Sequence, residues 1–163
     1  MKSTEERESL GPGNPRPGYR EVATFLGLPG ADALTKNEMT HLFSQGFPLE
    51  ALERIVQAIA PNDPDFPNMI VDPLDRASRQ AAGRLSTRES NLVYRLASVW
   101  IMALRGFRQP EIARSFLLSA NTIAFDGRTP LQTILEDKYG ADYVMMRLSV
   151  YTPTMEPTLY WLD

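Results

Sequence analysis

This chain of 163 residues contains no cysteine, which excludes a disulfide framework and a metal site built on thiolates. Its single histidine, His41, has no serine or acid that spacing would place beside it, so no catalytic triad is indicated. A phosphate-binding glycine loop, a nucleophile elbow and metal-ligand spacing are also missing. We therefore expect no catalytic residue, no metal and no cofactor, and a protein that is not an enzyme.

Long apolar runs and an excess of positive charge are missing as well. The longest uncharged apolar run, 97–104, is far shorter than the about 18 residues that a membrane span needs, and we find no signal peptide. The net charge is -3, with 9 basic and 12 acidic residues before Leu85 and 8 of each from Leu85 onward. The sequence therefore predicts a cytoplasmic protein with no membrane partner, in which any contact with DNA comes from a local cluster.

Strand-like alternation is nearly absent, and apolar residues recur at helical spacing, so the predicted fold class is all-α. Residues 62–71 are too rich in proline for a long helix. The longest predicted helix opens with a capping box, Ser86 and Glu89. Helices are predicted from Thr35 to Gly46, from Pro48 to Pro61, over 74–82, from Ser86 to about Arg105, and over 109–118, 130–136 and 139–148.

The two ends of the chain differ in composition from this helical part. Residues 1–20 combine acidic residues with prolines and glycines, and we expect a disordered arm because such a mixture cannot bury a core. Residues 151–163 form an apolar and aromatic tail that two prolines keep out of a helix. The apolar side chains of such a tail are expected to be buried against another surface. The tail packs on its own core or on a second copy of the chain, or it inserts into a partner.

The loop 118–131 is specified more closely than any other. Thr129 is the expected N-cap of the following helix, the proline after it is the first helical residue, and Gly127 tolerates a backbone that side chains forbid. Arg128 either caps a carbonyl or pairs with Asp126 within the chain, or it faces a partner. A loop of this kind is a tight helix connection, a surface that a partner recognises, or both.

A second cluster lies on and just after the predicted helix 74–82. Helix 49–60, the break after it and helix 74–82 match the parts of a helix-turn-helix, whose second helix enters the major groove. The alternative is an amphipathic helix with a charged face toward solvent. The side chains suited to phosphate or base contacts are Arg76, Ser78, Arg79 and Arg84.

An ordered set of short motifs spans about residues 83–151. They are Gly83-Arg84-Leu85-Ser86 with Glu89-Ser90, Tyr94-Arg95-Leu96-Ala97, Ala113-Arg114-Ser115-Phe116-Leu117, Asn121, Gly127-Arg128-Thr129-Pro130-Leu131, and Gly140-Ala141 with Val144 and Leu148. In order and spacing they resemble the toxin-binding domain of the bacterial Xre/MbcA/ParS antitoxin family. That family commonly has Trp where this chain has Phe116, and a Leu-Gly pair where it has Phe125-Asp126.

The resemblance implies the antitoxin of a type II toxin-antitoxin system, whose partner is a RES-fold toxin. Such toxins attack NAD by degrading it or by transferring its ADP-ribose to a protein, and the antitoxin blocks their NAD cleft. A homodimer within a hetero-oligomeric complex and autorepression through operator DNA are also implied. The implied parts are an arm (1–20), a degenerate Xre-like helix-turn-helix module for DNA binding or dimerisation (21–84), a compact toxin-binding domain (85–150) and an extended toxin-blocking tail (151–163).

We expect the toxin-binding residues in the loop and in the tail, because an apolar, aromatic segment suits a concave cleft. The alternative function is a stand-alone helix-turn-helix transcription regulator, which would use the arginine cluster around Arg76. The expected toxin-binding residues are Asn121, Asp126, Gly127, Arg128, Thr129, Tyr151, Leu159, Tyr160, Trp161, Leu162 and Asp163.

Overall fold

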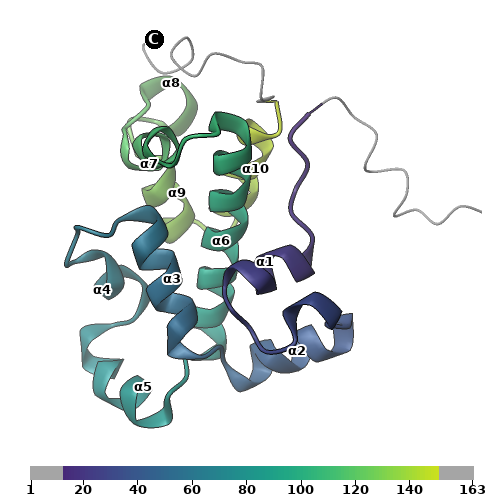
Figure 1. Ribbon diagram of the computed structural model, residues 1–163. Coiled ribbons are helices and arrows are strands. Elements are labelled where there is room, and N and C mark those ends of the chain that lie inside the picture. The colour runs from purple at the N-terminus through teal and green to yellow at the C-terminus, as the bar shows by residue number, and fades with distance from the viewer. Residues whose placement is uncertain (1–12, 151–163) are drawn as a thin grey trace, which may run out of the picture.

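The computed structural model describes residues 13–150, apart from the side chain of Thr122, and every regular element in that range is a helix (Figure 1). The all-α prediction is therefore confirmed. Two 3-10 helices are η2 (Ala31–Ala33) and η3 (Pro73–Asp75). The α-helices are α1 (Tyr19–Phe25), α2 (Lys36–Gln45), α3 (Leu49–Ile59), α4 (Phe66–Ile70), α5 (Arg76–Ala82), α6 (Thr87–Phe107), α7 (Pro110–Leu118), α8 (Thr122–Phe125), α9 (Pro130–Glu136) and α10 (Gly140–Leu148).

Helix α6 is the centre of the fold. It packs against α1 to α4 from the preceding part of the chain and against α7, α9 and α10 from the following part (Figure 1). Its capping box is the predicted one, because the Ser86 hydroxyl accepts from the Glu89 amide and the Glu89 carboxylate accepts from the Ser86 amide. Every side chain from Leu96 to Ala103 is buried. A helix buried on all sides is a core helix, and its neighbours are arranged around it.

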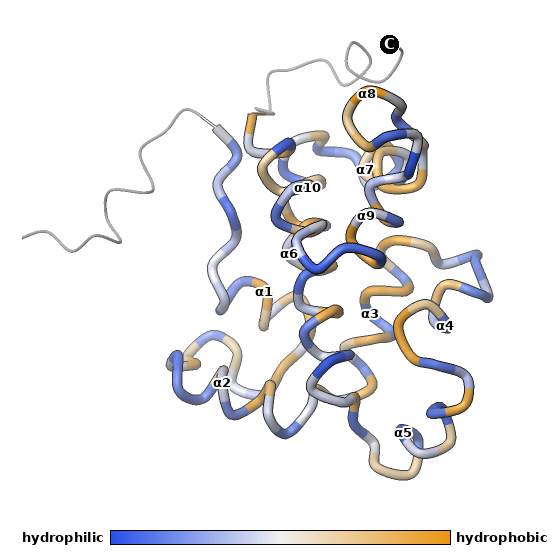
Figure 2. The backbone as a smooth tube through the Cα atoms, turned by 180° about the vertical axis from the view of Figure 1, so that it is seen from behind, coloured by the Kyte–Doolittle hydropathy of each residue, from blue (hydrophilic) through white to orange (hydrophobic). Residues whose placement is uncertain are grey.

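The buried apolar side chains form one cluster that runs from Val22 to Leu148. In Figure 2, apolar stretches occur in helices on both sides of residue 85, for example in α3 and α7. A direct link is Arg114 of α7, whose guanidinium donates to the Ala58 carbonyl of α3 at 2.7 Å and lies 5.8 Å from the ring centre of Trp100. The two predicted helical parts, 21–84 and 85–150, therefore share one core.

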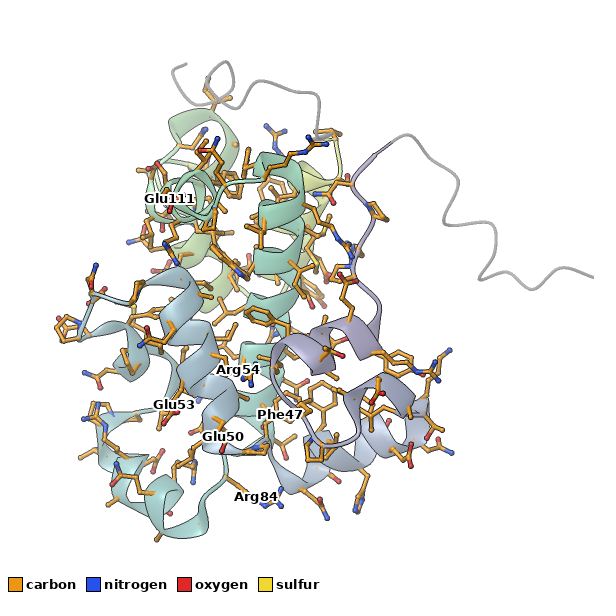
Figure 3. All side chains as sticks on the ribbon, viewed as in Figure 1. Phe47, Glu50, Glu53, Arg54, Arg84 and Glu111 are labelled. Atoms are coloured by element: carbon orange, nitrogen blue, oxygen red, sulfur yellow. The ribbon has the colours of Figure 1, made fainter. Side chains whose placement is uncertain are left out.

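A close backbone contact joins the start of α3 to the start of α6. The Leu85 amide donates to the Phe47 carbonyl at 2.8 Å, and the Phe47 amide donates to the Ser90 hydroxyl at 2.8 Å. Gly46 has φ +85°, and a Cβ there would lie 1.8 Å from the Leu85 carbonyl oxygen. Arg84 closes the same junction by donating to the Gly46 carbonyl at 3.1 Å, and Figure 3 labels Phe47 and Arg84 there. Only glycine at position 46 permits this approach.

The segment before α1 corrects a prediction. Residues 13–20 belong to the expected disordered arm, yet they are ordered against the core, because Asn14 is buried and makes two backbone links. Its side-chain amide donates to the Met102 carbonyl at 2.6 Å, and its main-chain amide donates to the Ser149 carbonyl at 2.9 Å. Arg16 pairs with Asp142 at 2.9 Å. We call residues 13–18 the N-terminal strap; residues 1–12 of the predicted arm lie outside the described range.

The bounds of the other helices can be compared with those predicted from the sequence. Helices α2, α3, α7, α9 and α10 begin and end within about a residue of the predicted positions, and α6 continues to Phe107 rather than Arg105. Glu50, Glu53 and Arg54 on α3 are exposed (Figure 3). The predicted helix 74–82 is η3 followed by α5, and 62–71 holds only the five-residue α4. Helices α1 and α8 were not predicted.

The start of α10 lies so close to α9 that Gly140 has no room for a side chain. A Cβ at Gly140 would lie 1.9 Å from the Thr133 carbonyl oxygen, whereas a Cβ at Gly18 would meet nothing within 4 Å. We expect Gly140→Ala to lower the free energy of unfolding by about 3 kcal/mol, since backbone must move. Gly18→Ala should cost less than about 1 kcal/mol. Urea denaturation checks both, and equal stability of the two variants would contradict the close approach.

Candidate protein-binding surface

The loop between α7 and α9 is closed by hydrogen bonds of Asn121. The Asn121 side-chain oxygen accepts from the amides of Ile123 at 3.0 Å and Ala124 at 2.7 Å, which caps α8. The Asn121 amide donates to the Arg128 carbonyl at 3.1 Å, and the Asn121 carbonyl accepts from Phe125 and from Gly127. The main chain of Asn121 thus joins the two ends of the loop, while its side chain caps α8, which explains why an asparagine opens the loop.

The second half of the loop has the geometry that its residue types predict. Asp126 and Gly127 both have positive φ, 52° and 78°, which turns the chain back after α8. Thr129 caps α9 by accepting from the Gln132 amide at 3.0 Å, and the Gln132 side chain accepts in return from the Thr129 amide. The predicted N-cap is confirmed. The loop is therefore a rigid connection whose backbone is fixed before any partner binds.

Arg128 does not pair with Asp126, which was one of the roles that the sequence left open. Its guanidinium pairs with Glu136 on α9 at 3.4 Å rather than with Asp126. Both partners of this ion pair are partly exposed, so water screens the interaction and it contributes little to stability. Arg128 is consequently held near the surface of the loop, where a charged group of a partner can compete for it.

An apolar stripe beside the loop was not predicted. Tyr139, Tyr143, Met146 and Val150 are exposed; Tyr143 and Met146 are three residues apart on α10 and share a side, while Tyr139 directly precedes the helix and Val150 follows its end. Ile123 of α8, 75% exposed, lies near this side, because the Tyr143 hydroxyl donates to the neighbouring Ala124 carbonyl at 2.6 Å. We call these five residues the α10 face. Exposed apolar side chains gathered this way are typical of interaction surfaces.

The sequence did contain a signal for the α10 face. Ala141, Val144, Met145 and Leu148 are buried and give α10 its inward side, which is the side that the prediction used. The remaining positions of the same helix include Tyr143 and Met146, and Tyr139 directly precedes it, so α10 also has apolar side chains on its outer side. A helix with two apolar sides needs a second neighbour. Within residues 13–150, no other element buries the outer side of α10.

The predicted tail residues continue directly from the α10 face. Val150 is the last residue described, and the tail residues of the expected toxin-binding set lie outside the described range: Tyr151, Leu159, Tyr160, Trp161, Leu162 and Asp163. The structure therefore brings the loop residues Asn121 to Thr129, the α10 face and the point where the tail begins to the same end of the molecule (Figure 1).

The predicted DNA-binding residues make contacts within the chain. Arg79 donates to the Glu89 carboxylate at 2.7 Å and lies 3.9 Å from Asp75, and Arg84 donates to the Gly46 carbonyl. Arg76 donates to the side chain of Asn68. Ser78 is exposed. The three arginines thus have protein partners already, and DNA would have to replace or share them.

The pair Arg79–Glu89 fastens α5 to the start of α6. The Glu89 side chain is only 8% exposed. Burial by itself would raise the pKa of the Glu89 carboxyl, but hydrogen bonds from Arg79 and from the amide and hydroxyl of Ser86 outweigh it and lower the pKa below its usual value. The hydrogen bond to Glu89 also raises the pKa of Arg79. Glu89 is therefore ionised near neutral pH and serves the helix cap and the ion pair together.

Among residues 13–150 no set of three or more histidine or acidic side chains is arranged to hold a metal ion. His41 is exposed on α2. A polar groove of about 540 Å³ lies between α4, α5, α6 and α9, and both acidic and basic side chains line it. Its best-placed acid, Glu89, is used by the capping box.

Comparison with known proteins adds no relative: no family model matches the sequence, and no curated protein matches it. None of the helices within 13–150 has the length and apolar character that crossing a bilayer requires.

The charge on Glu89 should be visible in the pH dependence of stability. Because its native pKa is lowered, ionised Glu89 stabilises the fold above the unfolded value of about 4.3, and this is lost as pH falls through the lower native pKa. We expect Glu89→Gln to lower the free energy of unfolding at pH 7 by about 1–3 kcal/mol. The difference from wild type should shrink as pH falls from about 5 through the lowered native pKa.

The matched control is Glu53→Gln on the exposed side of α3, which should change stability by less than about 0.5 kcal/mol at either pH. Chemical denaturation at a series of pH values measures both variants. A Glu89→Gln deficit that is constant from neutral to acidic pH would show that the carboxylate charge is not the stabilising feature.

Proposed function

We propose that this chain is a non-enzymatic antitoxin that neutralises a RES-fold, NAD-using toxin by covering its NAD cleft. The observation that carries the proposal is the continuity of three features at one end of the molecule. A hydrogen-bonded loop presents Arg128, the α10 face presents exposed apolar side chains, and an apolar, aromatic segment follows directly after Val150. Together they form a long surface suited to another protein.

The residues behind the family resemblance support the proposal because several of them have specific structural tasks. Gly83 ends α5 with φ +69°, Leu85 is buried at the α3–α6 junction, and Thr129 caps α9. Gly140 allows α10 to approach α9. Motif positions that specify turns and close contacts indicate a shared fold better than scattered apolar matches do.

The proposed mechanism needs no bond-making by this chain. A nucleotide cleft is concave and combines apolar walls with a few polar groups, so an extended segment with aromatic side chains can fill the volume that NAD needs. The rigid loop and the α10 face then hold the two proteins together while the segment after Val150 occupies the cleft. Fixing the loop in advance lowers the entropy cost of this association.

Removing residues 151–163 tests the occlusion step. The buried core ends at Leu148, before this segment, so the shortened chain should still fold and unfold cooperatively in urea. Its ability to stop NAD consumption by the RES-fold protein encoded in a neighbouring reading frame should be lost. Calorimetry with the same toxin shows whether the loop and the α10 face still bind. Full inhibition by the shortened chain would exclude blockage of the cleft by the tail.

A matched pair of methionines tests the α10 face. Met146 on α10 and Met69 on α4 are each 53% exposed, and Met69 is not part of the α10 face. We expect Met146→Glu to weaken toxin binding by about 10–100-fold, since it places a charge in an apolar contact. Met69→Glu should leave the affinity unchanged. Equal affinities of the two variants in calorimetry would remove the α10 face from the interface.

Operator DNA is a second candidate partner, supported by one observation. Helix α5 buries none of its side chains and stands at the edge of the fold (Figure 1). Binding through α5 predicts that Arg76→Ala lowers affinity for the DNA upstream of the gene by about tenfold and reduces the salt dependence by about one ion. Mobility-shift titrations at two salt concentrations measure both. Weak binding that ignores salt and the substitution would leave α5 without a role in DNA recognition.

A further inference from the structure

An apolar groove lies between α1 and α6. Its volume is about 550 Å³, within the range of about 300–1,000 Å³ typical of ligand pockets. The ion pair between Glu21 and Arg105 lies at the groove and joins its two walls. The apolar lining comes from both helices and includes Phe25, Trp100, Ile101 and Leu104, with the exposed Thr24 beside them.

The N-terminal strap brings the beginning of the tail close to this groove. The Asn14 amide donates to the Ser149 carbonyl at 2.9 Å, so the strap touches the residue next to Val150. One residue further along the strap, the Pro15 carbonyl accepts from Arg105, which lines the groove, at 3.2 Å. Asn14 and Pro15 of the strap therefore bridge Ser149, near the start of the tail, and Arg105, which lines the groove.

The residues after Val150 are long enough and apolar enough to fill the groove. Thirteen residues span at most about 43 Å when extended, which exceeds the dimension of a groove between two helices. Pro153 and Pro157 disfavour a helix and suit an extended segment. The segment also carries Leu159, Tyr160, Trp161 and Leu162, side chains that gain free energy by leaving water.

We propose that in the free protein residues 151–163 dock into the α1–α6 groove of the same chain. A segment tethered beside its binding site has an effective concentration in the millimolar range, well above that of a second copy at micromolar concentration. The apolar tail is then covered before a partner arrives. One consequence rests on the proposed function: a toxin that binds the tail must first draw it out of the groove.

The absence of cysteine permits a direct test by disulfide trapping. The full chain with Thr24→Cys and Thr158→Cys has one thiol on the exposed rim of the groove and one in the tail. Under mild oxidation we expect a disulfide within one chain, identified by mass. The control carries the same two cysteines with Trp161→Ala and Leu162→Ala, so the tether is unchanged while the apolar anchors are lost. Its disulfide should form about tenfold more slowly.

Each outcome decides the proposal. Faster trapping within one chain in the presence of the anchors supports it, whereas equal rates with and without them overturn it. A disulfide that joins two chains also overturns it, because the groove then holds a second copy. A second measurement avoids cysteine: Thr24→Arg should fill the groove and increase amide hydrogen exchange in 159–163, while Thr40→Arg, an exposed threonine on α2, should not.

Adding the candidate toxin separates this inference from the proposed function. If both hold, the toxin slows trapping, because it competes for the same segment. If trapping depends on the anchors but the toxin neither binds nor slows it, the docked tail stands and the antitoxin function fails. If the toxin binds tightly while trapping never depended on the anchors, the function stands and self-docking fails.

Discussion

The burial of the middle of α6, from Leu96 to Ala103, is the constraint on which the rest of this structure depends. A helix that exposes no side chain between Leu96 and Ala103 can persist only while its neighbours cover every side of it. Helices from both halves of the chain do so, and they are too short to be stable alone. The early helices therefore owe their order to the same core as the late ones. The junction at Gly46 and Leu85 fixes where these two groups meet.

The end of the molecule that carries the loop and α10 differs from this closed centre. Asn121 and Thr129 use their hydrogen-bonding groups to fix the backbone, while Ile123, Tyr143 and Met146 remain partly or largely exposed. A backbone fixed in advance loses less conformational entropy when a partner binds, and apolar side chains left exposed add no stability to the free protein. The free energy that this end can contribute is thus available to a neighbouring chain segment or another protein.

The sequence was most informative where local chemistry decides the structure. Capping residues such as Ser86 and Thr129 act within one turn of a helix, so their spacing predicts helix starts to within about a residue. The order of residues 13–18 depends instead on the hydrogen bond between Asn14 and Met102, 88 positions away, which leaves no local pattern. Likewise the pairing of Arg128 with Glu136, eight positions away at the end of α9, follows no local pattern in the sequence. The α10 face could be predicted only in part. The spacing of its residues is visible in the sequence, but packing against distant helices decides which apolar side of α10 faces the core.

The link between Asn14 and Ser149 also bears on how this fold can be rebuilt. Because the two ends of the described range are hydrogen-bonded to each other, a linker of a few residues would span the gap between them. The connection between α3 and α4, residues 61–65, is exposed throughout and offers a place to open the chain. A circular permutant with its new termini there would retain α6 and all its neighbours while changing which helices leave the ribosome first. Such a molecule would show whether the order of synthesis matters to a fold whose centre lies in the middle of its sequence.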